Sequence, residues 1–202
     1  TNHRYDTACY ERIDPLLGTE EDFRTLCERA RERGIRVLLD GVFNHTGRKS
    51  VYFNADGFYP TLGAAQGPAS PYYRWYSFHP FPDDYDAWWG IKNLPAVNET
   101  EQSYVDYIIE GEHSIIRRWL RAGASGWRLD VADELPDEFI ARIRRTIEEE
   151  RPDGYLLGEV WEDGTTKIAY SKRRKYLLGR ETHGLMNYPF RTALLDFLRG
   201  GD

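Results

Sequence analysis

Residues 123–130 read Gly-Ala-Ser-Gly-Trp-Arg-Leu-Asp: a glycine-bounded turn, a short apolar run and then an acid. Before this stretch, apolar residues recur at helical spacing between residues 104 and 121, which predicts a helix there. Trp127 to Leu129 is a short buried strand by composition, and Asp130 ends it. The unit that results is a helix, a turn, a strand and a terminal acid.

The same order occurs once upstream and once downstream. Upstream, a helical pattern stops at Gly34, and a strand over residues 35–39 ends in Asp40. Downstream, a second helical pattern leads to a strand over residues 155–157, and Glu159 follows it. Such repetition predicts parallel strands joined by crossover helices. The upstream helix has a capping-box pair and an apolar stripe, formed by Thr19 with Asp22 and by Phe23, Leu26, Cys27 and Ala30.

Each of the three strands is followed by an acid, so one edge of the sheet collects carboxylates. In a (β/α)8 barrel this edge is the rim where catalysis takes place, and a doubly wound sheet also binds ligands there. No glycine-rich phosphate loop follows a strand, which favours the barrel. We therefore predict an α/β fold, a partial (β/α)8 TIM barrel over residues 1–45 and 99–202, with an inserted irregular subdomain over residues 46–98.

The inserted segment has few regular signals and is rich in Gly, Pro and aromatic residues. A loop of this length within a compact domain is usually functional. We expect most of its aromatic side chains to pack in a small core of their own and a few to face the site.

Composition limits the partners. The net charge of −6 argues against nucleic acid and anionic membranes, and no apolar run is long enough to span a bilayer. No pair of His or Cys residues has the spacing of a zinc site. The sequence begins without Met or a visible signal peptide, so we expect a start within a longer protein. The compartment stays open, with the cytoplasm preferred over secretion.

Two of the strand-end acids suit the cleavage of a glycosidic bond, which needs one ionised and one protonated carboxyl group. Arg128 lies two residues before Asp130 and so shares its face of the strand, where a guanidinium would keep the carboxylate ionised as a nucleophile. Glu159 is followed by apolar Val160 and Trp161, which predicts a raised pKa and the role of general acid. Taken singly, each acid is more often structural than catalytic.

Three ordered motifs carry a family resemblance. They are residues 40–45 (Asp-Gly-Val-Phe-Asn-His), 126–134 (Gly-Trp-Arg-Leu-Asp-Val-Ala-Asp-Glu) and 158–161 (Gly-Glu-Val-Trp). They closely resemble three of the four signature regions of the α-amylase superfamily, glycoside hydrolase family 13. Residues 94–98 and 2–10 are similar to two further segments of the family. Within the family, the motifs resemble those of neopullulanases, cyclomaltodextrinases and maltogenic amylases.

The resemblance implies a retaining hydrolase, or a transglycosylase, that acts on α-glucans, maltooligosaccharides or cyclic dextrins. It implies that Asp130 is the nucleophile, Glu159 the acid/base and Arg128 the orienter of Asp130. Asp40 would brace Arg128. The remaining roles it implies are a sugar hydrogen bond from His45, stacking by Tyr5, and an acceptor-side lining by Trp161 and Glu134. Calcium at Asn44 occurs in some members but often not in this subgroup, so calcium stays open and no cofactor is required.

Departures from the family pattern qualify this reading. Cys9 stands where the family usually has an acid, and Asp133 where this subgroup usually has Asn. The fourth signature region, with a third acid and a second sugar-binding His, does not occur in the sequence. What looks like a sixth strand at residues 186–190 is followed by a helix at 192–198. We therefore expect this chain alone to be inactive and to self-associate through open sheet edges. A noncatalytic α-glucan-binding homologue is the alternative reading.

Overall fold

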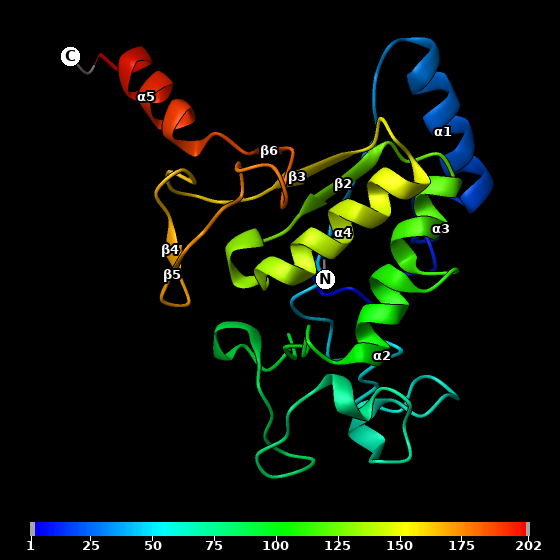
Figure 1. Cartoon of the computed structure of the whole chain (residues 1–202). Coiled ribbons are helices and arrows are strands. Elements are labelled where there is room, and N and C mark those ends of the chain that lie inside the picture. Colours follow the sequence, from blue (N-terminus) through cyan, green and yellow to red (C-terminus); the bar gives the residue numbers. More distant parts are fainter. Residues whose placement is uncertain (1–2, 201–202) are drawn as a thin grey trace.

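The computed structural model describes residues 3–200 and shows one parallel sheet with helices packed beside it (Figure 1). Its strands are β1 (Leu38–Gly41), β2 (Gly126–Leu129), β3 (Tyr155–Gly158) and β6 (Gly184–Leu185), and they pair in that order. All three pairings are parallel, which confirms the predicted fold class. Asn2 of the opening motif and residues 201–202 lie outside the described residues.

The register of the sheet decides which side chains meet. Asp40 on β1 is paired with Arg128 on β2, so the two side chains lie at the same height on neighbouring strands. Beyond the strand ends, the Asp130 N–H donates to Gly41 O and the Glu159 N–H donates to Leu129 O. The ladder therefore continues as far as the two acids and holds them at one edge of the sheet.

The first helix forms as its sequence predicts. α1 (Glu20–Glu32) begins with a capping box, in which Thr19 Oγ1 accepts from Asp22 N and Asp22 Oδ2 accepts from Thr19 N. Phe23 packs edge-on against Trp119 with ring centroids 5.4 Å apart. Leu26, however, is exposed, because α1 turns only Cys27 and Ala30 fully inward.

The predicted helix over residues 104–121 is wrong as a single element. The structure divides it into α2 (Gln102–Val105), a π-helical turn η4 (Asp106–Glu110) and α3 (Ile115–Arg121). The Gly111 N–H donates to Asp106 O, and Ser114 Oγ donates to Ile109 O, so both bonds close the first part before the second begins. Apolar periodicity runs through the break because both parts bury apolar residues, Ile108 and Ile109 before it and Ile115 and Ile116 after it.

The ends of two other predicted elements also move. β1 begins at Leu38 rather than at residue 35, and Ile35 is exposed. The predicted strand over residues 186–190 is wrong, since β6 ends at Leu185 and α5 (Tyr188–Leu198) follows. Asn187 caps α5 by accepting a hydrogen bond from Phe190 N, which starts the helix earlier than the apolar pattern indicates.

Residues 46–98 contain 3-10 turns, namely η1 (Ala64–Gln66), η2 (Tyr73–Trp75) and η3 (Trp88–Gly90). Tyr52, Phe53 and Trp75 are buried there, and their core is continuous with that of the sheet and helices. Trp89, by contrast, is exposed. The exact limits of the inserted subdomain stay a prediction.

The chain after Asp130 forms a 3-10 turn, a helix and a β-hairpin. The 3-10 turn η5 (Ala132–Glu134) follows Asp130, α4 (Asp137–Glu150) packs along β3, and β4 (Ile168–Ala169) with β5 (Lys172–Arg173) forms an antiparallel hairpin.

α5 projects away from the other helices (Figure 1) and none of its side chains is buried. The expected self-association stays a prediction. No helix of the described chain has the length and apolar character that a membrane crossing requires.

We expect Gly126→Ala to destabilise the fold by on the order of 3 kcal/mol or more. Gly126 has φ +153°, and a Cβ there would lie 1.9 Å from the backbone oxygen of Tyr155. The substitution therefore forces β2 and β3 apart. Urea unfolding would measure the change. Gly34→Ala is the control, because Gly34 has φ +71° with nothing within 4 Å, so only backbone strain of about 1 kcal/mol applies. Equal midpoints for the two variants would contradict the expectation.

Candidate active site

A cavity of about 560 Å³ opens where β1, β2 and β3 end. The residues that line it come from the N-terminal segment, the inserted segment and the strand ends: His3, Tyr5, Asp6, His45, Trp88, Ile91, Asn93, Leu94, Arg128, Asp130, Val131, Glu159 and Trp161.

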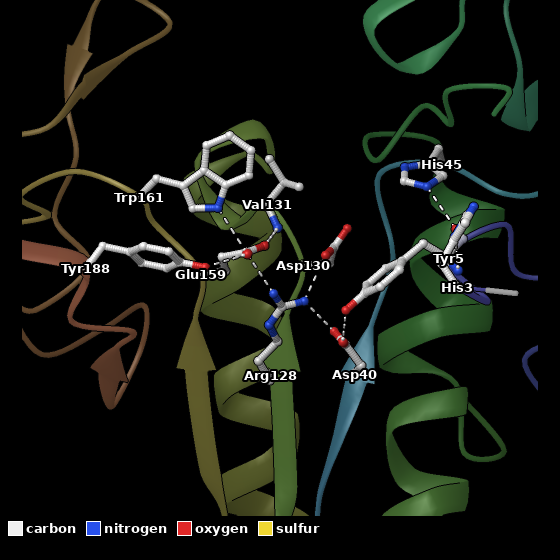
Figure 2. A network of polar contacts seen from close by, with 10 residues as sticks. All are labelled: His3, Tyr5, Asp40, His45, Arg128, Asp130, Val131, Glu159, Trp161 and Tyr188. Atoms are coloured by element: carbon white, nitrogen blue, oxygen red, sulfur yellow. Dashed lines mark hydrogen bonds and ion pairs between the residues drawn. The ribbon is translucent and has the colours of Figure 1, made fainter. Parts of the chain in front are cut away.

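Arg128 joins three carboxylates within this site (Figure 2). Its Nη1 lies 2.6 Å from Asp40 Oδ1 and 2.8 Å from Asp130 Oδ1, and its Nη2 lies 2.8 Å from Glu159 Oε1. The structure therefore brings together the three residues predicted to be catalytic, with Asp40 beside Arg128 as the resemblance implies. Charge-assisted contacts of this kind orient both partners.

Asp130 is buried, and burial raises its pKa to about 6. Arg128 acts in the opposite direction, while the charges of Asp40 and Glu159 add to the rise. Arg128 thus acts in the direction that the sequence predicts, but the loss of water outweighs this one shared guanidinium, and the role of Asp130 as nucleophile stays a prediction.

The pKa of Glu159 also departs from the sequence prediction. Burial works to raise it, but the Val131 N–H, Trp161, Arg128 and Tyr188 together hold the pKa of Glu159 below its usual value. Val131 N donates to Oε2 at 2.9 Å, and Trp161 Nε1 donates to Oε1 at 3.0 Å. The predicted raised pKa is wrong because the Val131 N–H donates to the carboxylate and because Trp161 turns its N–H, rather than its apolar face, toward it.

Tyr5 and His45 form the opposite wall of the cavity (Figure 2). The Tyr5 hydroxyl donates to Asp40 Oδ2 at 3.1 Å, and His45 Nε2 lies 3.0 Å from the carbonyl oxygen of Tyr5. Burial lowers the pKa of His45 to about 4, so the ring is neutral at pH 7 and donates from Nε2. With Nδ1 buried and without a partner, the sugar contacts of His45 and Tyr5 stay predictions.

Glu134 does not line the cavity. Its two carboxylate oxygens accept hydrogen bonds from Trp88 Nε1 and Trp89 Nε1, each at 2.6 Å. The two indoles are stacked with centroids 4.9 Å apart. The indole of Trp88 lines the cavity, and the exposed Trp89 lies edge-on to Trp161. Glu134 therefore reaches the predicted acceptor side through tryptophans rather than directly.

Sequence reasoning missed two groups that contact Glu159. Tyr188, the first residue of α5, donates its hydroxyl to Glu159 Oε1 at 3.2 Å. No local signal marks it, because the contact depends on where α5 begins. The backbone N–H of Val131 is the other group, and no side-chain pattern can reveal it.

Asn44, the residue at which some family members hold calcium, is buried, and neither its amide oxygen nor its amide nitrogen has a hydrogen-bond partner. A free amide oxygen is one ligand that calcium accepts, but calcium takes six to eight. Over residues 3–200, no group of three or more His, Cys, Asp or Glu side chains gathers in a metal-binding arrangement. Calcium binding through Asn44 therefore stays open, as it was in the sequence.

Comparison with known proteins places this geometry in a family. The α-amylase catalytic domain family matches residues 1–201. The chain is 38% identical to an amylopullulanase of Thermoanaerobacterium saccharolyticum over 99% of its own length and 16% of the relative's. It is 35% identical to a cyclomaltodextrinase of a Bacillus species, of which it covers 33%.

Solved structures of similar proteins indicate the same family. The ligand-free cyclic α-maltosyl-(1→6)-maltose hydrolase of Arthrobacter globiformis matches with a TM-score of 0.81 and 30% identity, over 98% of this chain and 42% of that one. The chain thus spans less than half of each of these proteins, and its sheet forms part of a (β/α)8 barrel. It belongs to the α-amylase superfamily, glycoside hydrolase family 13, within the catalytic domain.

Proposed function

We propose that the intact protein is a retaining α-glycoside hydrolase that acts on α-glucans such as maltooligosaccharides or cyclic dextrins. The observation that carries the proposal is the single guanidinium of Arg128, which contacts both Asp130 and Glu159 in one cavity. Two carboxyl groups placed on either side of a bond are what glycoside hydrolysis requires. Relatives named cyclomaltodextrinase and maltogenic amylase support the substrate class.

In the proposed reaction, Asp130 attacks the anomeric carbon while Glu159 gives its proton to the leaving oxygen. A covalent glycosyl–Asp130 intermediate results, and the leaving sugar departs as an alcohol. Glu159, now ionised, then removes a proton from water, and that water displaces Asp130. Transfer to a second sugar follows the same path with a sugar hydroxyl in place of water.

The first step requires Asp130 to be ionised and Glu159 to be protonated. Arg128 contacts Asp40, Asp130 and Glu159, so one positive charge faces three acids. A single proton shared by Asp130 and Glu159 prefers Asp130, because the pKa of Asp130 is raised and that of Glu159 is lowered. The reactive arrangement needs the proton on Glu159. Substrate that fills the cavity removes water from Glu159 and favours its protonated form.

We expect kcat/KM to be bell-shaped in pH and to fall as the pH rises above about 6. The last proton of the Asp130–Glu159 pair leaves near the raised pKa of Asp130, and with it the reactive form disappears. Initial rates on maltooligosaccharides at low substrate concentration, from pH 4 to pH 8, would measure this. A plateau that continues above pH 7 would contradict this sharing of one proton between the two acids.

The function itself is tested by the stereochemistry of the product. Proton NMR during hydrolysis of a maltooligosaccharide should show the α-anomer first, followed by slow mutarotation. Initial β-anomer would overturn the retaining mechanism. Binding of the sugar without any product would favour the alternative, a noncatalytic α-glucan-binding protein, and products longer than the substrate would show transglycosylation.

A further inference from the structure

Val131, the residue after Asp130, has a strained backbone. Its φ of 45° and ψ of 55° lie in the left-handed region, which costs a β-branched residue about 1–2 kcal/mol. This conformation turns the Val131 N–H toward Glu159 Oε2, at 2.9 Å (Figure 2). Strain of this kind persists only where the surroundings hold it in place.

Arg174 holds the segment that follows. It lies directly after β5, and its side chain is only 2% exposed. Its Nη1 donates to the carbonyl oxygen of Asp133 at 2.9 Å, and its Nη2 donates to that of Leu135 at 2.7 Å. Its Nε lies 2.6 Å from Asp137 Oδ1 at the start of α4. One buried guanidinium thus connects the hairpin with residues 133–137.

Lys167, just before β4, adds a second connection. Its Nζ lies 3.0 Å from Asp133 Oδ2, and the Arg174 N–H donates to the Lys167 carbonyl oxygen at 2.9 Å. The two ends of the β4–β5 hairpin therefore both contact the segment behind Asp130. Asp133, which stands where this subgroup usually has Asn, thus pairs its carboxylate with Lys167.

We propose that Arg174 is a positioning residue for the acid/base group: it fixes residues 131–135 so that the strained Val131 N–H reaches Glu159. The inference rests on the proposed function for the role of Glu159. The contact between Arg174 and this segment stands independently of that role.

The other groups that face Glu159 do not depend on Arg174. Arg128 and Asp130 belong to β2 and its end, Tyr188 begins α5, and Trp161 follows β3. Removal of Arg174 should leave these charges and side-chain donors in place and loosen the Val131 contact, together with the adjacent bond from the Ala132 N–H to the Glu159 carbonyl oxygen. The ionisation of Glu159 is therefore a specific measure of what Arg174 does.

The test is a ¹³C NMR titration of the Glu159 carboxyl in the protein and in Arg174→Met, with the resonance assigned by its loss in Glu159→Gln. We expect the titration midpoint of Glu159 to move to higher pH in Arg174→Met, because a donor to the ionised form is lost. Arg151→Met is the matched control. Arg151 donates to the Ala124 carbonyl oxygen at 2.7 Å, at the opposite end of β2, so its loss should leave the midpoint unchanged. An unchanged midpoint in Arg174→Met would overturn the proposal.

Arg174→Lys covers the case in which Arg174→Met fails to fold. An ammonium keeps the charge near Asp137 but cannot span both carbonyl oxygens, so we expect a smaller shift in the same direction. No shift in this folded variant would also overturn the proposal.

Kinetics separates this inference from the proposed function. In the intact protein, Arg174→Met should lower kcat roughly 10- to 100-fold with little change in KM, since the acid is misplaced while the sugar contacts remain. A shifted titration in a protein without hydrolase activity would support the positioning role and reject the proposed function. A shifted titration with unchanged kcat would reject the catalytic consequence of the Val131 contact.

Discussion

Asp130→Asn should abolish turnover and, at neutral pH, make the protein more stable. Turnover should fall at least about 10³-fold, because an amide cannot form the glycosyl ester. Stability should rise because the wild-type carboxylate is buried, so that its ionised form is disfavoured. The neutral amide keeps nearly the same shape beside Arg128 and removes a charge that faces Asp40 and Glu159.

The sign of the pH dependence follows from the raised pKa. Asp130 titrates at about 6 in the folded protein and at 3.8 ordinarily, so folding favours its protonated form. This preference is present below pH 3.8 and is lost as the pH rises through 6. The increase in the free energy of unfolding from Asp130→Asn should thus be absent near pH 3.5. At pH 7.5 it should be on the order of 2 kcal/mol, with allowance for solvent screening, or roughly 5 °C in Tm.

Glu159→Gln is the matched control, with equal loss of activity and the opposite effect on stability. The pKa of Glu159 is lowered because Val131, Trp161, Arg128 and Tyr188 favour its ionised form against the effect of burial. That stabilisation is present above pH 4.5 and is lost as the pH falls through the folded pKa. Thermal unfolding of both variants at pH 7.5 should move Tm in opposite directions. A decrease for Asp130→Asn at pH 7.5 would show that the Arg128 contact outweighs burial.

Arg128→Leu should destabilise the protein by roughly 3–5 kcal/mol at neutral pH. The guanidinium is 15% exposed and is shared by Asp40, Asp130 and Glu159. Without it, the three carboxylates repel one another, and Asp130 and Glu159 are buried without a counter-charge. Urea unfolding at pH 8 and at pH 5 should show the larger loss at pH 8, where more of the acids are ionised.

Two further variants separate charge repulsion from lost packing. Addition of Asp130→Asn to Arg128→Leu should recover part of the loss, and more of it at pH 8 than at pH 5. Arg118→Leu removes an exposed arginine that pairs with Glu20 at 2.7 Å, and should cost no more than about 1 kcal/mol. If Arg128→Leu proved as mild as Arg118→Leu, Arg128 would not be what holds the acids together.

Local sequence was enough to determine the parallel α/β sheet and the edge at which the acids gather. Helical spacing, a turn and a short apolar strand recur ahead of Asp40, Asp130 and Glu159. Alternation along a strand places Arg128 and Asp130 on one face, and parallel pairing then brings them to Asp40. The repeated units and the shared face of Arg128 and Asp130 depend on neighbours a few residues apart, which is why a single sequence reveals them. The contact of Arg128 with Asp40 joins residues 88 positions apart, and only the family resemblance implied it.

Only the tertiary structure decided the surroundings of the two acids. The pKa of each acid depends on lost water and on donors that come from distant segments, such as Val131 and Tyr188 for Glu159. The residues next to Glu159 in sequence predicted a raised pKa, whereas the folded protein lowers it. Composition does not show whether Trp161 presents its ring face or its N–H to the carboxylate. The connection from Arg174 to the segment behind Asp130 likewise spans about forty residues of chain. Electrostatics at a buried site is set through space, and the sequence determines it only after the chain has folded.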